Sequence, residues 1–220
     1  MSIGRQLVIN KLSKEYKASV ELNSHQSKVI YGLMLGDLHA SRGKSTHNTR
    51  LQFNQGTVHT EYAQHLYDLF LPFINQLIYT TVRQPDPRTG LIYTSLLFKT
   101  LAFPFFNIYR DLYYFPAYGS GIRVLPLNLA DYFTVISFAY WIMDDGTYAQ
   151  GVLKFCTDSF TLDQVQFLCD MLGSKYDINC HPQHRAKGQY CIYIANREID
   201  KVRALVRPYI IPSMLYKIGL

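Results

Sequence analysis

The chain has 220 residues, of which 48% are hydrophobic, so it is long enough to bury a sizeable core as one domain or as two fused halves. Its 22 Lys and Arg residues exceed its 16 Asp and Glu residues, and the net charge of +6 suits a polyanionic partner without proving one. No apolar run approaches the ~18 residues that a membrane-spanning helix needs, so we expect no membrane partner.

Residues 1–22 are predicted to form an N-terminal arm ahead of the first periodic segment. Between Met1 and Lys17 the only acid is Glu15, and the basic residues include a single Arg. Organellar import sequences are usually amphipathic and rich in Arg and Ser. We therefore expect synthesis inside the compartment where the protein works rather than import, and a contact between the arm and a polyanionic partner stays open.

The hydrophobic period then changes in a regular order. The segment 24–37 has apolar residues at helical spacing, whereas 50–54 alternates polar and apolar residues, as in a strand with one face on the core and one toward water. The predicted elements are, in chain order, a helix at 24–37, strands at 39–42 and 50–55, a helix at 59–74, strands at 77–83 and 91–99, and a helix at 103–114.

The second half of the chain repeats the first. Leu51-Gln52-Phe53 matches Leu153-Lys154-Phe155, and the helical and turn segments that follow match in the same order. We therefore predict two versions of one unit, at residues 23–115 and 130–220. Residues 116–129 contain Gly and Pro and little periodicity, and they are interpreted as the linker between the two units.

Each half also contains an apolar run that ends in acidic residues. The first run is Ile30 to Asp37, and the second is Phe138 to Gly146 with Asp144 and Asp145 near its end. Carboxylates at a helix C-terminus face the negative end of the helix dipole, so a cation is needed to balance them. Either run alone would be interpreted as a core helix with a solvated acid. Both together favour a shared metal site.

The two runs resemble the nine-residue motif Leu-Ala-Gly-Leu-Ile-Asp-Ala-Asp-Gly. The first run keeps Gly32, Leu33 and Asp37, and the second keeps Ala139, Asp145 and Gly146. The chain therefore resembles the LAGLIDADG homing endonuclease family in its single-chain, two-motif form. Among its members the chain is most similar to the omega-type endonucleases encoded by mitochondrial introns. The resemblance covers about residues 20–218.

The resemblance implies an α+β fold of two pseudo-symmetric αββαββα halves. The two motif helices would pack at the centre, and the antiparallel sheets would form a saddle that binds DNA. Gly32 and Gly36 lack side chains where two helices would need close backbone approach. Tyr140 and Asp144 occupy the matching positions of the second motif, so the packing is expected to be asymmetric.

For the active site, the resemblance implies that Asp37 and Asp145 hold metal ions under the scissile phosphates. The backbone carbonyls of Gly36 and Asp144 would add further ligands. Asp144 is assigned a carbonyl role rather than a side-chain role because Gly36 occupies its matching position. Hard oxygen ligands favour Mg²⁺, Mn²⁺ is a plausible substitute, and Ca²⁺ is expected to bind without supporting cleavage.

The family also keeps a basic residue near each cleavage centre. Lys217 lies where the resemblance expects one, although an ordinary C-terminal cation is the alternative, and Arg123 stands in place of the first-half Lys. Because Arg stays protonated and has a planar fork, we expect the two DNA strands to be cut at unequal rates. Gln52 and Lys154, which match in the repeat, are further candidates for holding the water network.

The exposed faces of the predicted sheets are expected to bind DNA, because they carry Arg forks, amides and cations and few acids. The alternative is that these are ordinary solvated strand faces. The predicted DNA-binding residues are His39, Lys44, Arg50, Gln52, Asn54, Arg83, Arg88, Lys99, Lys154, His181, Gln183, Arg185, Lys187 and Gln189.

The expected activity is thus Mg²⁺-dependent, sequence-specific cleavage of double-stranded DNA. It would leave a staggered break across the minor groove of a long, asymmetric site. Two different halves imply a monomer, and the resemblance implies a mitochondrial, organelle-encoded protein. One alternative is an intron maturase, an RNA-binding splicing cofactor with its own intron RNA as partner. Another is a DNA-binding regulator without nuclease activity, which would be expected to have lost at least one motif acid.

Overall fold

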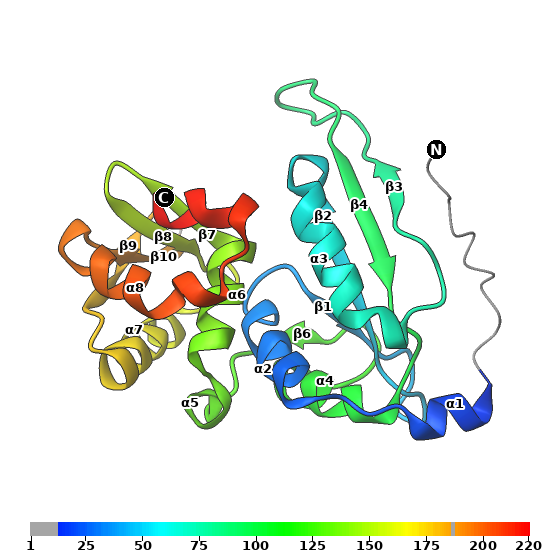
Figure 1. Cartoon of the computed structure of the whole chain (residues 1–220). Coiled ribbons are helices and arrows are strands. Elements are labelled where there is room, and N and C mark those ends of the chain that lie inside the picture. Colours follow the sequence, from blue (N-terminus) through cyan, green and yellow to red (C-terminus); the bar gives the residue numbers. More distant parts are fainter. Residues whose placement is uncertain (1–12, 186–187) are drawn as a thin grey trace.

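The computed structural model describes residues 13–185 and 188–220, so most of the predicted arm and the predicted DNA-binding residue Lys187 lie outside the described residues. Each half has the order helix, two strands, helix, two strands, helix (Figure 1). The first half contains α2 (Ser24–Leu33), β1 (His39–Ser41), β2 (Arg50–Gly56), α3 (Thr60–Phe70), β3 (Tyr79–Val82), β4 (Thr94–Lys99) and α4 (Asn107–Tyr113). The second contains α6 (Val135–Asp145), β7 (Gly146–Ala149), β8 (Val152–Cys156), α7 (Leu162–Tyr176), β9 (Cys180–His184), β10 (Tyr190–Ile194) and α8 (Ile199–Val206).

The remaining elements are short. A helix α1 (Lys14–Ser19) precedes the first half, and a two-stranded ribbon of β5 (Tyr114–Phe115) and β6 (Ile122–Arg123) leads to α5 (Leu129–Tyr132). The chain closes in a 3-10 segment at Pro212–Ile218. The predicted α+β fold is confirmed. In the described part of the chain, no helix is long and apolar enough to cross a membrane.

Two antiparallel four-stranded sheets have matching strand orders, β1-β2-β4-β3 and β7-β8-β10-β9. In β2, Leu51 and Phe53 are buried while Arg50 is exposed, as the alternation in the sequence predicted. Helix α3 packs on the first sheet and α7 on the second. The opposite faces of the two sheets are called the open face below.

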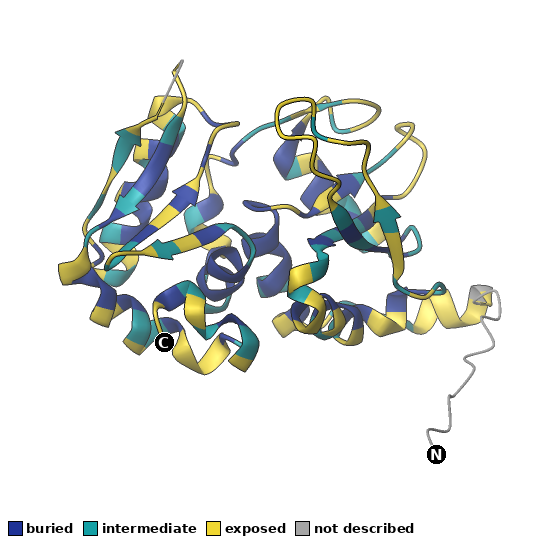
Figure 2. Ribbon diagram, turned by 90° about the horizontal axis from the view of Figure 1, so that it is seen from above, coloured by how far each residue is buried: buried dark blue, intermediate teal, exposed yellow. Residues whose placement is uncertain are grey.

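The motif helices α2 and α6 pack against each other at the centre, among the most buried parts of the molecule (Figure 2). A Cβ at Gly32 would overlap the backbone carbonyl of Ser137 on α6, so only glycine allows this approach. The Ser137 hydroxyl donates to the Lys28 carbonyl at 2.8 Å, which joins the two helices further.

The first motif helix is shorter than predicted, because α2 ends at Leu33 and residues 34–37 form turns. Here the amides of Leu35 and Gly36 bond to carbonyls three residues back, which tightens the chain after the helix. The second motif remains helical through Asp145. Gly32 and Gly36 of the first motif are matched by Tyr140 and Asp144 in the second, which fits this asymmetry because Gly disfavours helix.

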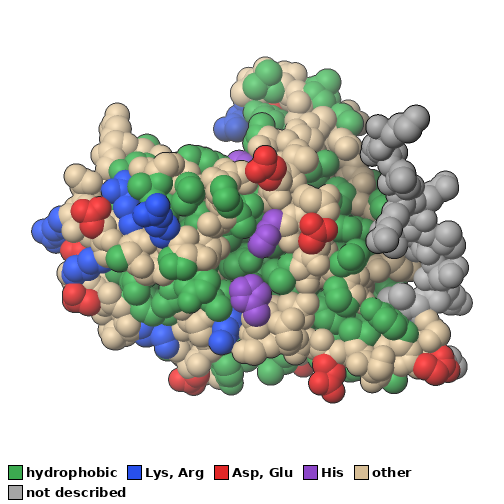
Figure 3. All heavy atoms as spheres, in the orientation of Figure 1, with side chains coloured by type: hydrophobic (Ala, Val, Ile, Leu, Met, Phe, Trp, Pro, Cys, Tyr) green, Lys and Arg blue, Asp and Glu red, His purple; other side chains and the backbone are tan. Residues whose placement is uncertain are grey.

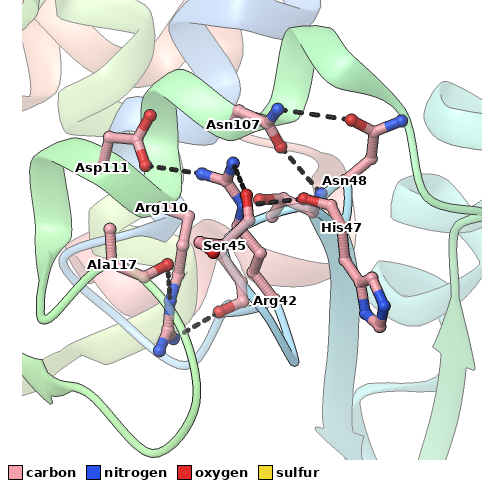
Figure 4. Close-up of polar contacts among 10 residues, drawn as sticks. Arg42, Ser45, His47, Asn48, Asn107, Arg110, Asp111 and Ala117 are labelled. Carbon is pink, nitrogen blue, oxygen red and sulfur yellow. Dashed lines mark hydrogen bonds and ion pairs between the residues drawn. The ribbon is translucent and has the colours of Figure 1, made fainter.

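The predicted linker, 116–129, is held in place by Arg110 of α4, a fully buried cation (Figure 4). Its guanidinium donates to the carbonyls of Ala40, Ala117 and Gly119 at 2.7, 3.1 and 2.9 Å. It also stacks on the Tyr114 ring, 3.7 Å from the centroid. This single side chain therefore joins β1 to the start of the linker.

The loop between β1 and β2 is longer than its counterpart, since β7 and β8 are joined by Gln150 and Gly151 alone. Arg42 organises this longer loop (Figure 4). Its guanidinium donates to the carbonyls of His47 and Ser45, both at 2.7 Å, and pairs with Asp111 at 2.9 Å. The loop therefore has a defined conformation at the edge of the open face.

Arg110→Ala is expected to destabilise the protein strongly, by on the order of 3 kcal/mol, because it removes a buried side chain and leaves three carbonyls, of which that of Ala40 is buried, without their donor. The melting temperature should fall by roughly 2–4 °C per kcal/mol for a chain of this size. Thermal unfolding followed by circular dichroism measures it, with exposed Arg207→Ala as the control. A loss no larger than that of the control would contradict a structural role for Arg110.

Candidate active site

The two motif acids meet because the C-terminal ends of α2 and α6 lie together. Asp37 is exposed just beyond α2, and Asp145 is the half-buried last residue of α6. Asp144 lies beside both, and the three carboxylates repel one another. The fold thus brings together the acids that the sequence placed far apart.

Desolvation raises the pKa of all three acids. The pKa of Asp144 rises to about 7 and the pKa of Asp145 to about 8, first through burial and then through the neighbouring carboxylates. The pKa of Asp37 also rises through desolvation, although Arg123 and Lys217 oppose the rise. The protein alone therefore leaves this negative charge poorly balanced, and a divalent cation would relieve it.

The Asp144 side chain is fully engaged in contacts with the first half. Its Oδ2 accepts the backbone N–H of Asp37 at 2.6 Å, and its Oδ1 accepts Nε2 of Gln55 at 2.6 Å. The carboxylate fills the space next to Gly36, where any Cβ would overlap it. These contacts occupy both oxygens of the Asp144 side chain.

The two basic residues occupy equivalent places in the two halves. Lys217 donates from Nζ to the carbonyl of Gly146 at 2.8 Å, and Arg123 donates from Nη2 to the carbonyl of Leu38 at 2.6 Å. Each of these carbonyls belongs to the residue directly after the motif acid. Desolvation lowers the pKa of Lys217, while the three acids oppose this change.

Arg123 makes one contact that Lys217 does not. Its Nη1 donates to the carbonyl of Gly36 at 2.5 Å, the same oxygen that the resemblance implies as a metal ligand. A carbonyl oxygen has two lone pairs, but a guanidinium and a divalent cation on one oxygen repel each other. The first-half centre is therefore chemically different from the second.

Gln52 and Lys154 lie at matching positions of the two sheets, each beside the first residues after a motif acid. Gln52 pairs across the strands with His39, and Lys154 pairs with Thr147. The His39 ring is held by the Tyr114 hydroxyl at 3.1 Å from Nδ1. Both candidates for organising water thus lie on the open face, on strands that pair with the segment after a motif acid.

The structure places the predicted DNA-binding side chains of the strands on the open face. The residues on this face or in the loops at its edges are His39, Lys44, Arg50, Gln52, Asn54, Arg83, Arg88, Lys99, Lys154, His181, Gln183, Arg185 and Gln189. Two of the cations are paired: Arg88 with Asp86 at 3.7 Å and Arg185 with Asp158 at 3.3 Å. The others leave the face predominantly positive outside the acid cluster.

A cavity of about 260 Å³ adjoins Asp37 on the open face, lined also by Asn54, Arg83 and Tyr93. The side-chain oxygen of Asn54 is buried and has no hydrogen-bond partner among the described residues. An unpaired acceptor in a polar cavity is suited to a ligand or water that donates to it.

The face that carries α3, α7 and α8, called the helical face below, bears both acidic and basic side chains (Figure 3). Lys and Arg lie close to Asp and Glu there, and Lys201–Asp177 and Arg203–Asp200 are ion pairs at 2.7 and 3.1 Å. Part of the positive charge on the helical face is therefore neutralised by neighbouring acids.

Gln55, Tyr62 and Tyr114 lie in or next to the site but were not predicted from the sequence. Tyr62 of α3 is fully buried, and burial together with the acid cluster raises the pKa of its hydroxyl. That hydroxyl has no partner within the described residues. Tyr62 lies in the helix predicted at 59–74, and no sequence signal indicated that its hydroxyl lies near the acids.

The donor set fits a hard divalent cation. Within the described residues, no group of three or more His, Cys, Asp and Glu side chains is arranged to hold a metal ion. Two carboxylates and backbone carbonyls are oxygen donors, and Mg²⁺ usually binds few protein oxygens and keeps several waters. Asp37, Asp145 and the Asp144 carbonyl are consistent with that chemistry.

Asp145→Asn is expected to stabilise the metal-free protein at alkaline pH. The pKa of Asp145 is about 8 in the folded state and about 3.9 in an unfolded chain. The folded protein binds this proton more tightly than the unfolded chain does, and this difference stabilises the fold. The contribution is fully present below the pKa of the unfolded chain and is lost as pH rises through the pKa of the folded protein. The melting temperature of the variant should therefore exceed that of the wild type by an amount that increases with pH up to about pH 8 and is constant above it. Melting curves in EDTA measure this gain, and one that shrinks with rising pH would contradict the assignment.

The sequence is similar to one protein family and to several intron-encoded proteins. The sequence model of the LAGLIDADG DNA endonuclease family matches residues 27–202. The chain is 36% identical over 207 residues to the cytochrome b mRNA maturase bI2 of Saccharomyces cerevisiae, covering 90% of this chain and 48% of that protein. It is 29% identical over 220 residues to the probable intron-encoded endonuclease 1 of Wickerhamomyces canadensis, covering 95% and 90%.

A solved structure, the homing endonuclease I-WcaI bound to its DNA recognition sequence, superposes with a TM-score of 0.84. Its sequence is 25% identical, and the match covers 96% of this chain and 95% of that one. The fold and the paired acids thus define a two-motif protein of the endonuclease type. The chain belongs to the LAGLIDADG DNA endonuclease family, and it spans about half the length of the yeast maturase that it matches.

Proposed function

We propose that this protein is a divalent-metal-dependent, sequence-specific DNA endonuclease. The single observation that carries the proposal is the meeting of Asp37 and Asp145, with raised pKa values, at the junction of two positively charged sheet faces. The superposition on a homing endonuclease bound to DNA supports it. A regulator without nuclease activity is disfavoured because both acids are present.

In this mechanism Asp37 and Asp145 would hold the metal, with the Asp144 carbonyl as a further ligand. A bound Mg²⁺ ion would lower the pKa of an attacking water and stabilise the leaving oxygen. Lys217 and Arg123 balance charge at the two scissile phosphates, and Gln52 and Lys154 hold water between the sheet and the phosphates. We propose a staggered break across the minor groove, with the open face contacting base edges and phosphates.

The pseudo-symmetric halves lie in one chain, so we propose a monomer that binds a long, non-palindromic site. Relatives named for introns and for cytochrome b support an organellar, mitochondrial origin. Mg²⁺ is the proposed metal, with Mn²⁺ as a substitute and Ca²⁺ as an ion that binds without cleavage.

An intron maturase is the second candidate, favoured by the names of two relatives. The bI2 maturase of Debaryomyces hansenii is 33% identical over 205 residues, covering 90% of this chain and 75% of that protein. Both activities can reside on one scaffold, since RNA and DNA are both polyanions. We propose the endonuclease first because its acids are intact.

Incubation of the purified protein with duplex DNA spanning the intron-free exon junction of its gene, with Mg²⁺ or EDTA, tests the first candidate. Filter binding to the intron RNA, run beside it, tests the second. Cleavage in Mg²⁺ alone supports the endonuclease. Tight, specific RNA binding without cleavage would reject the endonuclease in favour of the maturase.

A further inference from the structure

We infer that the Asp144 carboxylate is a positioning group that acts between the halves: it belongs to the second half but fixes the catalytic Asp37 of the first. This inference rests on the proposed function for its effect on cleavage, though not for its structural content. It assigns to Asp144 and Gln55 a role that their places in the motif and strand do not reveal.

The contacts of Asp144 all lie across the junction of the halves. One carboxylate oxygen accepts the backbone N–H of Asp37, and the other accepts the amide of Gln55 from β2, each at 2.6 Å. Two short hydrogen bonds to one side chain, from donors on different segments, fix that side chain and both donors in place. Holding the Asp37 amide limits how the Asp37 carboxylate can turn toward the phosphates.

The arrangement is built on the asymmetry of the two motifs. Gly36 has no side chain, and its place is filled by the Asp144 carboxylate. Gln55 is buried, so water does not easily replace Asp144 as the acceptor of its side-chain amide. The pseudo-symmetric contact cannot form, because Gly36 offers no carboxylate to the second half. Asp37 is therefore fixed by Asp144, whereas Asp145 is fixed by its own helix.

Exchange of the acid and the amide tests this inference. Gln55→Glu places two carboxylates against each other and should slow cleavage by at least about tenfold, as coupled neighbouring residues do. Asp144→Asn should be milder, because its amide oxygen still accepts the Asp37 N–H and Gln55 can rotate to accept the amide. The double variant Asp144→Asn with Gln55→Glu restores complementary donors and acceptors and should recover most of the rate lost in Gln55→Glu.

The exposed pair Gln64–Asp68 on α3, joined at 2.8 Å, is the matched control. Gln64→Glu and Asp68→Asn, alone or together, should change neither the cleavage rate nor the hydrogen exchange of the Asp37 amide. If the Asp144 carboxylate were a metal ligand instead, Asp144→Asn would abolish cleavage and the double variant would not recover it. That result would overturn the inference.

A second measurement does not depend on activity. In metal-free protein, the Asp37 amide proton should resonate far downfield and exchange slowly with solvent. In Gln55→Glu it should lose protection by at least about tenfold, and in the double variant it should regain it. If protection of the Asp37 amide is lost and regained in this way but the wild type cuts no DNA, the contact between Asp144 and Asp37 is supported and the proposed function is rejected. If the wild type cuts DNA but the amide is unaffected by Gln55→Glu, the inference fails alone.

Strand-resolved rates separate positioning from general stability. Gln55→Glu should slow mainly the strand that Arg123→Ala slows, since both affect the first-half centre. Equal slowing of both strands, with a lower melting temperature, would show that the contact merely stabilises the fold and would overturn the inference.

Discussion

Asp37→Asn and Asp145→Asn are each expected to abolish double-strand cleavage, with losses of at least about 10³-fold, while DNA affinity stays within about tenfold of the wild type. The carboxylates would hold the metal, whereas affinity would come from the cations and amides of the open face. Single-turnover cleavage at saturating enzyme, with binding measured in Ca²⁺, gives both quantities.

Asp68→Asn, on the helical face, is the matched control and should cut at the wild-type rate. Because Asp145→Asn is expected to be at least as stable as the wild type at alkaline pH, unfolding would not explain its loss of activity there. Cleavage reduced by less than tenfold in either acid variant would remove that acid from the proposed metal site.

Lys217→Met is expected to slow cleavage by roughly 10² to 10⁴-fold, as positioned catalytic groups do. Its ammonium is half-buried beside the acids and bound to the Gly146 carbonyl, so no solvent cation would replace it easily. End-labelling each strand should show one strand slowed more than the other. Lys201→Met on the helical face is the control, and an equal loss in both variants would reject a catalytic role.

Arg123 differs from Lys217 in occupying the Gly36 carbonyl as well. We therefore expect Arg123→Lys to be mild or activating, because a single ammonium can keep the Leu38 contact and release Gly36 for a metal. Arg123→Ala should slow cleavage more than it weakens binding. If Arg123 only bound a phosphate, Arg123→Ala would behave differently. The affinity for DNA would fall and the salt dependence of binding would decrease by about one charge, while the cleavage rate at saturating enzyme would stay unchanged.

The fold could be predicted from sequence because it repeats. Matching Leu51-Gln52-Phe53 with Leu153-Lys154-Phe155 indicated one unit used twice, and strand alternation fixed which side chains face the core. The end of α2 was predicted too late, since apolar periodicity continues past Leu33 although the backbone changes to turns. Periodicity reports which side a residue faces and not whether its backbone remains helical.

The site could be predicted only in part, for a similar reason. The motif acids and Lys217 stand in recognisable patterns, but Gln55, Tyr114 and Arg110 act through contacts between distant segments. Asp144 shows this most clearly: its motif position suggested a backbone role, and its side chain crosses to the other half of the molecule. Such contacts depend on the packing of two helices, which no local pattern encodes.

Selection of cleaved molecules from a randomised duplex library, with Mg²⁺ and the intact chain, tests the central claim most directly. We expect recovery of one long, asymmetric site cut on both strands with a stagger, at unequal rates, and no recovery with Asp37→Asn or in EDTA. Recovery of no cleaved site from the wild type, or of the same sites with Asp37→Asn, would contradict it.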